Sequence, residues 1–199
     1  MSLNVKLDTT KLGEWAQVLS GGEIKNAVRR AIDQSARYAR KETIKVIAAD
    51  IGVPAAKFKT ATPKVKSSTA AFLSATWTVS KSRIGILNVA GARISKSTGL
   101  TASTHRLSGG KSQSLNIRKA FVVKSKDGGT YVAYRTGTAR LPIKGVYAEH
   151  PATAIGQANA PAAKEWAQTA SRETHARLGV ELQKTLNGKF ASSNTSDDG

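Results

Sequence analysis

A helical repeat of apolar residues from Ile24 to about Asp50 constrains the fold of this chain more than any other feature. Apolar side chains recur on one face, at Ile24, Val28, Ile32, Ala39, Val46 and Ile47. Basic side chains recur about every four residues on another face. Ser20-Gly21-Gly22-Glu23 forms a capping box at the start, and Gly52 can end the helix in a left-handed conformation. We therefore expect one long amphipathic helix with a buried apolar face.

A second long helix is expected near the other end of the chain. Its apolar and small residues step by four, at Trp166, Ala170, Thr174, Leu178, Leu182 and Leu186. Asn159 can cap its start just before Pro161, and Asn187-Gly188 is predicted to end it.

Shorter elements are expected near the first long helix. Alternation of Leu3, Val5 and Leu7 predicts a short strand, and residues 12–19 fit a short amphipathic helix. Pro54 suits the first turn of another short helix that runs through Lys59.

Between the two long helices, alternation of apolar and polar residues predicts strands. Residues 76–80 and 84–89 are predicted to pair as a hairpin, and so are residues 120–125 and 130–135, around Lys126-Asp127-Gly128-Gly129. Residues 141–147 are predicted to form an edge strand, because Pro142 cannot donate to a ladder.

These elements predict an α+β fold, with two long helices packed on an antiparallel sheet of about four to six strands. A single domain is expected over residues 1–190, since the chain is too short for two full domains. Residues 91–115 are rich in Gly, Ser and Thr with scattered basic residues, and we interpret them as a flexible basic loop or arm. The small, polar residues 191–199 are expected to form a disordered tail.

The charge of the chain is concentrated in one segment. Residues 51–126 contain fourteen Lys and Arg and no Asp or Glu, within a chain whose net charge is +18. A uniform distribution would place about five acidic residues in that segment. Their absence indicates a surface that faces an anionic partner, either a nucleic acid or an acidic protein.

Several classes of site are not expected. The chain has no cysteine, which excludes disulfides, thiolate zinc sites and cysteine nucleophiles. Gly109-Gly110-Lys111-Ser112 lacks the first glycine of a P-loop, and His105, His150 and His175 have no ligand-like spacing. Glu149-His150-Pro151 is predicted to fix a turn. We expect neither catalysis nor a metal or cofactor.

No signal peptide or membrane-spanning segment is expected. The first ten residues are polar and alternating, and no stretch approaches eighteen consecutive apolar residues. The sequence therefore favours a soluble protein made in the cytoplasm.

Ten basic residues are candidates for contact with DNA in a channel or with a neighbouring subunit. They are Lys57, Lys59, Lys64, Lys66, Arg93, Lys96, Arg106, Lys111, Arg118 and Lys119. The aromatic residues of the same segment, Phe58, Phe72, Trp77 and Phe121, are predicted to lie in the core and not to stack on bases.

The sequence also resembles the prophage minor tail protein Z family of long-tailed bacteriophages. The resemblance runs from roughly Leu3 to Phe190 and rests first on the long helix with Ala27-Val28-Arg29-Arg30-Ala31. It continues with the Gly52-Val53-Pro54 break, the hairpin and the element Arg140-Leu141-Pro142-Ile143-Lys144.

This resemblance implies a structural tail-completion protein at the head-proximal end of the tail. Such a protein would form a ring, commonly a hexamer, and contact a tail terminator or tail tube protein and the head connector around a channel that DNA crosses. It would be located in the virion, and in the host cytoplasm during assembly. The alternative is a cytoplasmic nucleic-acid-binding protein, ribosomal or architectural, that grips phosphates through residues 51–126.

Overall fold

A computed structural model describes residues 2–6, 22–104, 113–126, 128–156 and 159–193. The chain divides into two compact units, each built from separate parts of the sequence. The helix unit comprises Asn4–Thr43, Pro63–Thr78 and Lys164–Gly199, and the sheet unit comprises Met1–Leu3, Ile44–Thr62 and Val79–Ala163.

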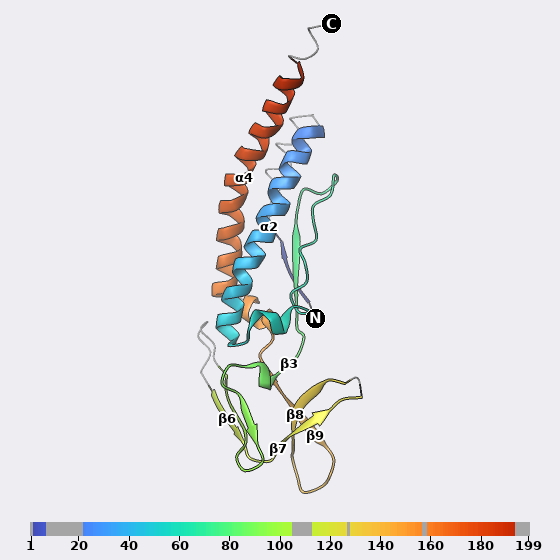
Figure 1. The fold of residues 1–199 in the computed structure, drawn as a ribbon, viewed down its shortest axis with the longest axis vertical. Coiled ribbons are helices and arrows are strands. Elements are labelled where there is room, and N and C mark those ends of the chain that lie inside the picture. Colours follow the sequence, from blue (N-terminus) through green and yellow to red (C-terminus); the bar gives the residue numbers. More distant parts are fainter. Residues whose placement is uncertain (1, 7–21, 105–112, 127, 157–158, 194–199) are drawn as a thin grey trace. The chain divides into compact units, whose positions relative to one another are not determined.

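Two long helices supply most of the helix unit, and residues 44–51 of the first and 161–163 of the second belong to the sheet unit. The two helices are α2, which spans Gly22–Ile51, and α4, which spans Pro161–Ser193. Figure 1 shows these helices side by side. Arg30 Nε on α2 donates to Glu181 Oε2 on α4 at 2.6 Å, and Arg177 Nη1 on α4 donates to Gln34 Oε1 on α2 at 3.2 Å. These polar bonds fix the register of the two helices at positions about one turn apart on each helix.

The core of the helix unit combines small and large side chains. Ala27, Ala31 and Ile32 of α2 are completely buried, and small residues of this kind let a neighbouring element approach the helix closely. The rings of Trp77 and Trp166 lie 5.2 Å apart between centroids. Pairs of buried aromatic rings at this distance contribute packing energy beyond the area that they bury.

The sheet unit contains two antiparallel sheets, whose strands are visible in Figure 1. The first has the order β3-β9-β8-β7, with β3 at Ile84–Gly85, β9 at Ile143–Ala148, β8 at Thr130–Arg135 and β7 at Ala120–Lys124. The second has the order β4-β5-β6, with strands at Arg93–Ser95, Gly99–Thr104 and Gln113–Ile117. Both sheets bury apolar residues, among them Leu100 on β5 and Val132 on β8.

Short helices and one short sheet complete the described residues. The 3-10 helices η1 and η2 span Ala55–Phe58 and Ile86–Asn88, and α3 spans Pro151–Ile155. Strand β1, at Ser2–Lys6, pairs with β2, at Thr76–Ser80.

Much of the predicted secondary structure is confirmed. The α+β class, both long helices, β1 and the β7–β8 hairpin are present. Gly52 follows α2 with a φ of 66°, as expected for a glycine that ends a helix. The short helix after Pro54 forms as the 3-10 helix η1. Residues 12–19 and the capping serine Ser20 lie outside the described residues.

The hairpin predicted from residues 76–80 and 84–89 is wrong. β2 pairs with β1, β3 pairs with β9, and residues 86–88 form η2. The amide of Ser80, at the end of β2, donates to the carbonyl of Ala61 at 2.8 Å. The end of β2 is therefore bonded to Ala61, and the chain after it does not turn back to pair with β2.

The irregular loop predicted over residues 91–115 is also corrected, because it contains β4, β5 and the start of β6. Thr is a good strand former, and the burial of Leu100 and Ala102 anchors the central strand. Arg106 and Lys111, from the middle of that range, lie outside the described residues.

Three further features differ from the sequence prediction. β9 lies between β3 and β8 and is not an edge strand, since Pro142 precedes the ladder. The helix α4 passes Asn187-Gly188 and ends at Ser193. The described strands form sheets of two, four and three strands in place of one larger sheet, and the single domain over residues 1–190 stays a prediction.

Candidate functional site

The predicted basic residues that the structure describes are exposed, and they are divided between the two units. Lys64 and Lys66 belong to the helix unit. The others belong to the sheet unit: Lys57 and Lys59 in and after η1, Arg93 on β4, Lys96 in the β4–β5 turn, and Arg118 and Lys119 in the turn between β6 and β7. The acid-free segment therefore contributes positive charge to both units separately.

Lys64 joins two arginines from α2 in a basic pocket of the helix unit. Arg37, Arg40 and Lys64 line this pocket of about 510 Å³, together with Val65 and Ser67. Arg37 Nη2 donates to Ser67 Oγ at 3.3 Å, and Arg40 Nε donates to the carbonyl oxygen of Pro63 at 2.8 Å. These bonds hold the two guanidinium groups in place at the pocket.

Arg40 is also the most constrained cation of the basic pocket. Its guanidinium carbon lies 5.9 Å from the centroid of the Trp77 ring, within the range of a cation–π interaction. Partial burial lowers the pKa of Arg40, yet a guanidinium remains charged at neutral pH. The pocket therefore offers a fixed positive charge that suits a phosphate or a carboxylate.

Arg37 and Arg40 were absent from the sequence-based set because both lie before the acid-free segment. The available signal was the basic face of the first predicted helix. The spacing of the basic residues does not predict which loop covers that face. The Pro63–Ser67 segment, which does so, lies more than twenty residues further along the chain.

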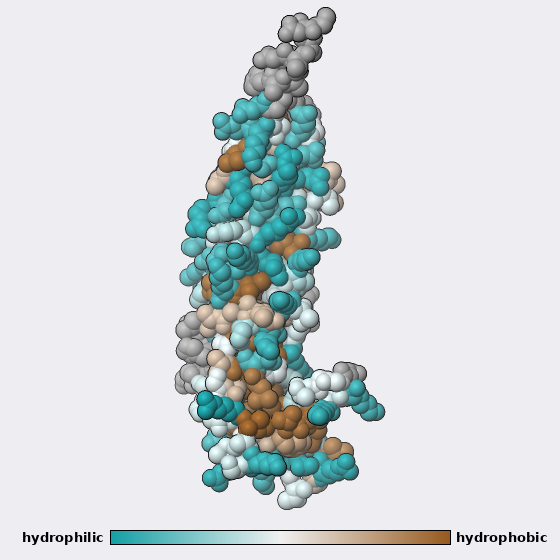
Figure 2. All heavy atoms as spheres, in the orientation of Figure 1, coloured by the Kyte–Doolittle hydropathy of each residue, from teal (hydrophilic) through white to brown (hydrophobic). Residues whose placement is uncertain are grey.

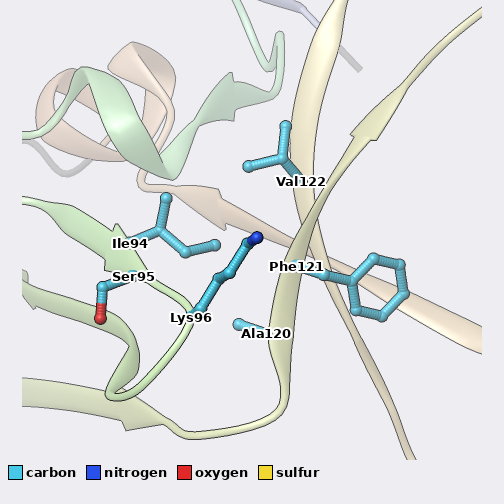
Figure 3. A pocket seen from close by; sticks show the side chains of 6 residues that line it. All are labelled: Ile94, Ser95, Lys96, Ala120, Phe121 and Val122. Carbon is cyan, nitrogen blue, oxygen red and sulfur yellow. The ribbon is translucent and has the colours of Figure 1, made fainter.

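An apolar pocket of about 330 Å³ lies in the sheet unit, between β4 and β7. Its lining comprises Ile94, Ser95, Lys96, Ala120, Phe121 and Val122. Figure 3 shows the side chains of Ile94 and Val122 facing the same space, with the Lys96 side chain extending between them. Val122 keeps 47% of its surface exposed. We call this feature the β4–β7 pocket.

The strand that forms one wall of the β4–β7 pocket is also an edge of its sheet. Within the described residues β7 pairs on one side only, with β8. The Phe121 side chain points to the other side of β7 in Figure 3, where the Arg135 guanidinium lies 4.7 Å from its ring. Phe121 is only partly covered and does not lie in the core as predicted, and the Arg135 guanidinium stacks on its ring.

A narrow arm of the helix unit presents an exposed aromatic residue. We call residues 66–76 the 66–76 arm, because Lys66 and Thr76 exchange backbone hydrogen bonds of 2.8 and 3.0 Å at its base. At its tip the amide of Thr69 donates to the carbonyl of Phe72 at 2.9 Å, and the amide of Phe72 donates to Thr69 Oγ1 at 3.1 Å. The Phe72 side chain is 73% exposed. The predicted core position of Phe72 is therefore wrong, whereas Phe58 and Trp77 are buried as predicted.

The arm is attached to α2 by its first residues. Asp33 Oδ1 accepts from the amide of Ser68 at 2.7 Å, and Arg29 Nη2 donates to the carbonyl of Ser68 at 3.3 Å. These contacts position the turn that carries Phe72.

The hydropathy of the surface differs between regions of the chain. In Figure 2 the surface over the long helices is mostly hydrophilic, while hydrophobic residues gather over the strands of the sheet unit. The exposed large hydrophobic residues include Phe72, Leu87, Val122, Leu141 and Val180. A hydrophobic patch such as the one over the strands in Figure 2 often marks a contact with another protein.

The described histidines make local structural contacts. His150 Nδ1 accepts from the amide of Thr153 at 3.2 Å and caps α3, and Thr153 Oγ1 donates to Glu149 Oε2 at 2.9 Å. The predicted turn at Glu149-His150-Pro151 is thus confirmed as the start of a short helix. His175 Nδ1 lies 2.9 Å from the carbonyl oxygen of Ser171 on α4, one helical turn earlier.

The residues that the structure describes contain no cluster of three or more metal-ligating side chains. None of their helices is long and apolar enough to cross a membrane. The P-loop-like residues 109–112 and His105 lie outside them.

Comparison with known proteins returned one family. The family model described as prophage minor tail protein Z (GPZ) matches residues 16–190. No curated protein and no solved structure matches the chain.

Proposed function

Since the chain belongs to the prophage minor tail protein Z family, we propose that it forms a ring at the head-proximal end of a phage tail. Membership in this family identifies it as a bacteriophage minor tail protein and a component of the virion. In the proposed role it completes the tail, helps to join it to the head-neck connector and positions the end of the DNA.

The distribution of charge supports a ring around a channel. Each copy carries a net charge of +18, with exposed cations such as Lys96 and Lys119 on the sheet unit. A hexamer repeats every basic group six times, so weak contacts with the DNA backbone add through multivalency. Such contacts are independent of base sequence.

The proposed partners are other proteins of the virion. A tail terminator or tail tube protein would contact one face of the ring, and a head connector protein the other. Subunits would assemble in the host cytoplasm before incorporation into the tail. The proposed role is structural, and among the described histidines His150 serves as a helix cap.

A cytoplasmic nucleic-acid-binding role is the alternative. The basic pocket of Arg37, Arg40 and Lys64 favours it, because fixed guanidinium groups bind phosphate well. Tight binding of free duplex DNA by a monomer, with a steep dependence on salt, would support this role.

Localisation in the virion tests the proposed function directly. Phage particles carrying an epitope tag after Gly199 should bind one cluster of gold-labelled antibody per tail, at the junction with the head. Label along the whole tail, or at the far tip, would contradict the head-proximal position. A second experiment measures binding of the purified chain to duplex DNA over a series of salt concentrations, and we expect weak binding.

A further inference from the structure

We propose that Phe72 of one copy inserts into the β4–β7 pocket of a second copy. This inference rests on the proposed ring and names the side chains that join neighbouring subunits. It uses two features that the described contacts of a single chain leave unexplained, an exposed aromatic side chain and a partly apolar pocket.

The Phe72 side chain is presented by an ordered turn. The two hydrogen bonds between Thr69 and Phe72 and the base pair of Lys66 and Thr76 hold the tip in a fixed conformation. An aromatic side chain on a preorganised turn loses little conformational freedom when it binds. Large, rigid residues of this kind supply most of the binding energy in many protein interfaces.

The β4–β7 pocket has the size and chemistry to receive that ring. Its volume of about 330 Å³ lies at the lower end of pockets that enclose small ligands, which span about 300–1,000 Å³. Ile94 and Val122 provide apolar walls, as Figure 3 shows. The Lys96 side chain offers a methylene stem and an ammonium group, and an ammonium group over an aromatic face adds a cation–π interaction.

The distribution of charge allows a second copy to be the occupant. Copies with a net charge of +18 repel one another, and the turns beside the pocket carry Lys96, Arg118 and Lys119. A docking element from the same chain must therefore lack positive charge. Residues 67–80 contain no charged side chain, although they lie within the segment that holds fourteen basic residues.

The geometry of the contact agrees with a ring. The Phe72 turn and the pocket are different surfaces, so each copy would donate one and accept one. Such heterologous contacts generate a closed ring when the rotation between neighbours closes.

Removal of the Phe72 ring tests the contact. Phe72→Ala should weaken self-association by about 30-fold or more, as expected for loss of an interface anchor. The folded chain should keep its thermal stability, because the Phe72 side chain is 73% exposed. Val180→Ala is the matched control, since Val180 is an apolar residue of α4 that is 52% exposed. Sedimentation velocity over a concentration series measures the association.

The outcomes separate this inference from the proposed function. A ring that forms equally well with Phe72→Ala would overturn the docking contact and leave the ring intact. A wild-type chain that stays monomeric at every concentration would overturn both. Equal weakening by Val180→Ala would also overturn the contact, because self-association would then depend on exposed apolar surface in general and not on Phe72.

Cross-linking gives a second, independent test. The chain contains no cysteine, so single introduced cysteines report on one position each. A mixture of Ala71→Cys and Val122→Cys chains, which keeps the Phe72 ring, is treated with a short bismaleimide and should yield a two-chain product that either variant alone yields poorly. A mixture of Val180→Cys and Val122→Cys is the control, and equal yields in the two mixtures would contradict the proposal.

Discussion

Glu181 is the most informative ionisable residue of the described chain. Its carboxylate is almost buried on α4 and accepts from Arg30 of α2 at 2.6 Å. The hydrogen bond from Arg30 lowers the pKa of Glu181 from the ordinary value of 4.5, and attraction by Lys184 adds to this effect against the opposing effect of burial. The ionised carboxylate therefore stabilises the contact between the two long helices.

This shift predicts how stability depends on pH. The unfolded chain has the higher Glu181 pKa, so it takes up the proton first as the pH falls. The contribution of Glu181 is therefore fully present above the unfolded pKa, near 4.5, and is lost as the pH falls through the lower folded pKa. Glu181→Gln should lower the urea midpoint at neutral pH and flatten its fall below pH 4.5.

The control for Glu181 lies on the same helix. Glu173→Gln removes an ion pair with Arg177 within α4, at 3.0 Å, and should lower the urea midpoint at neutral pH less than Glu181→Gln does. An equal change in both variants would contradict the role given to the contact between helices.

The backbone conformation at position 99 requires a glycine. Its φ is 72°, and a Cβ at this position would overlap the carbonyl group of Ile117 on β6. Gly99→Ala combines a strained conformation with a steric clash, and should destabilise the fold by about 2–4 kcal/mol in urea unfolding. Gly91→Ala shares a φ of 79° but meets no atom within 4 Å, so its cost should be about 1–2 kcal/mol. Equal losses would show that the close approach of β5 to β6 is unimportant.

At the scale of elements, the 66–76 arm depends on its attachment to α2. Asp33→Ala removes the acceptor for the Ser68 amide. We expect faster hydrogen exchange at Ser68 and its neighbours in the arm, with little change in the Ala27–Ile32 turn of α2, measured by mass spectrometry. Asn26→Ala, which removes only a weak contact with Arg29 at 3.4 Å, is the control. Unchanged exchange at Ser68 in Asp33→Ala would show that the arm is held by other contacts.

Elements with strong local signals could be predicted from the sequence, and elements defined by distant pairing could not. The period of α2 and the Gly128-Gly129 turn of the β7–β8 hairpin are local features. The pairing of β3 with β9 joins Ile84 to Ala148. No local sequence pattern predicts a pairing between residues so far apart in the chain. β4 and β5 were missed because their Ser, Thr and Gly residues are also typical of loops.

At the scale of the whole molecule, the sequence predicted the sign of the surface charge better than its arrangement. Most of the predicted cations are exposed, yet they belong to two units, because the chain passes between these units repeatedly. Arg37 and Arg40 could not be assigned to a site before the Pro63–Ser67 segment was seen to lie beside them. The same holds for Phe72, since its apolar character alone favours the core.

Assembly of this minor tail protein into a ring can be observed by native mass spectrometry of the purified full chain over a range of concentrations. We expect an assembly of six copies of the 21.0 kDa chain, with annular particles in negative-stain images of the same sample. A single 21.0 kDa species at every concentration, with no annular particles, would contradict assembly into a ring.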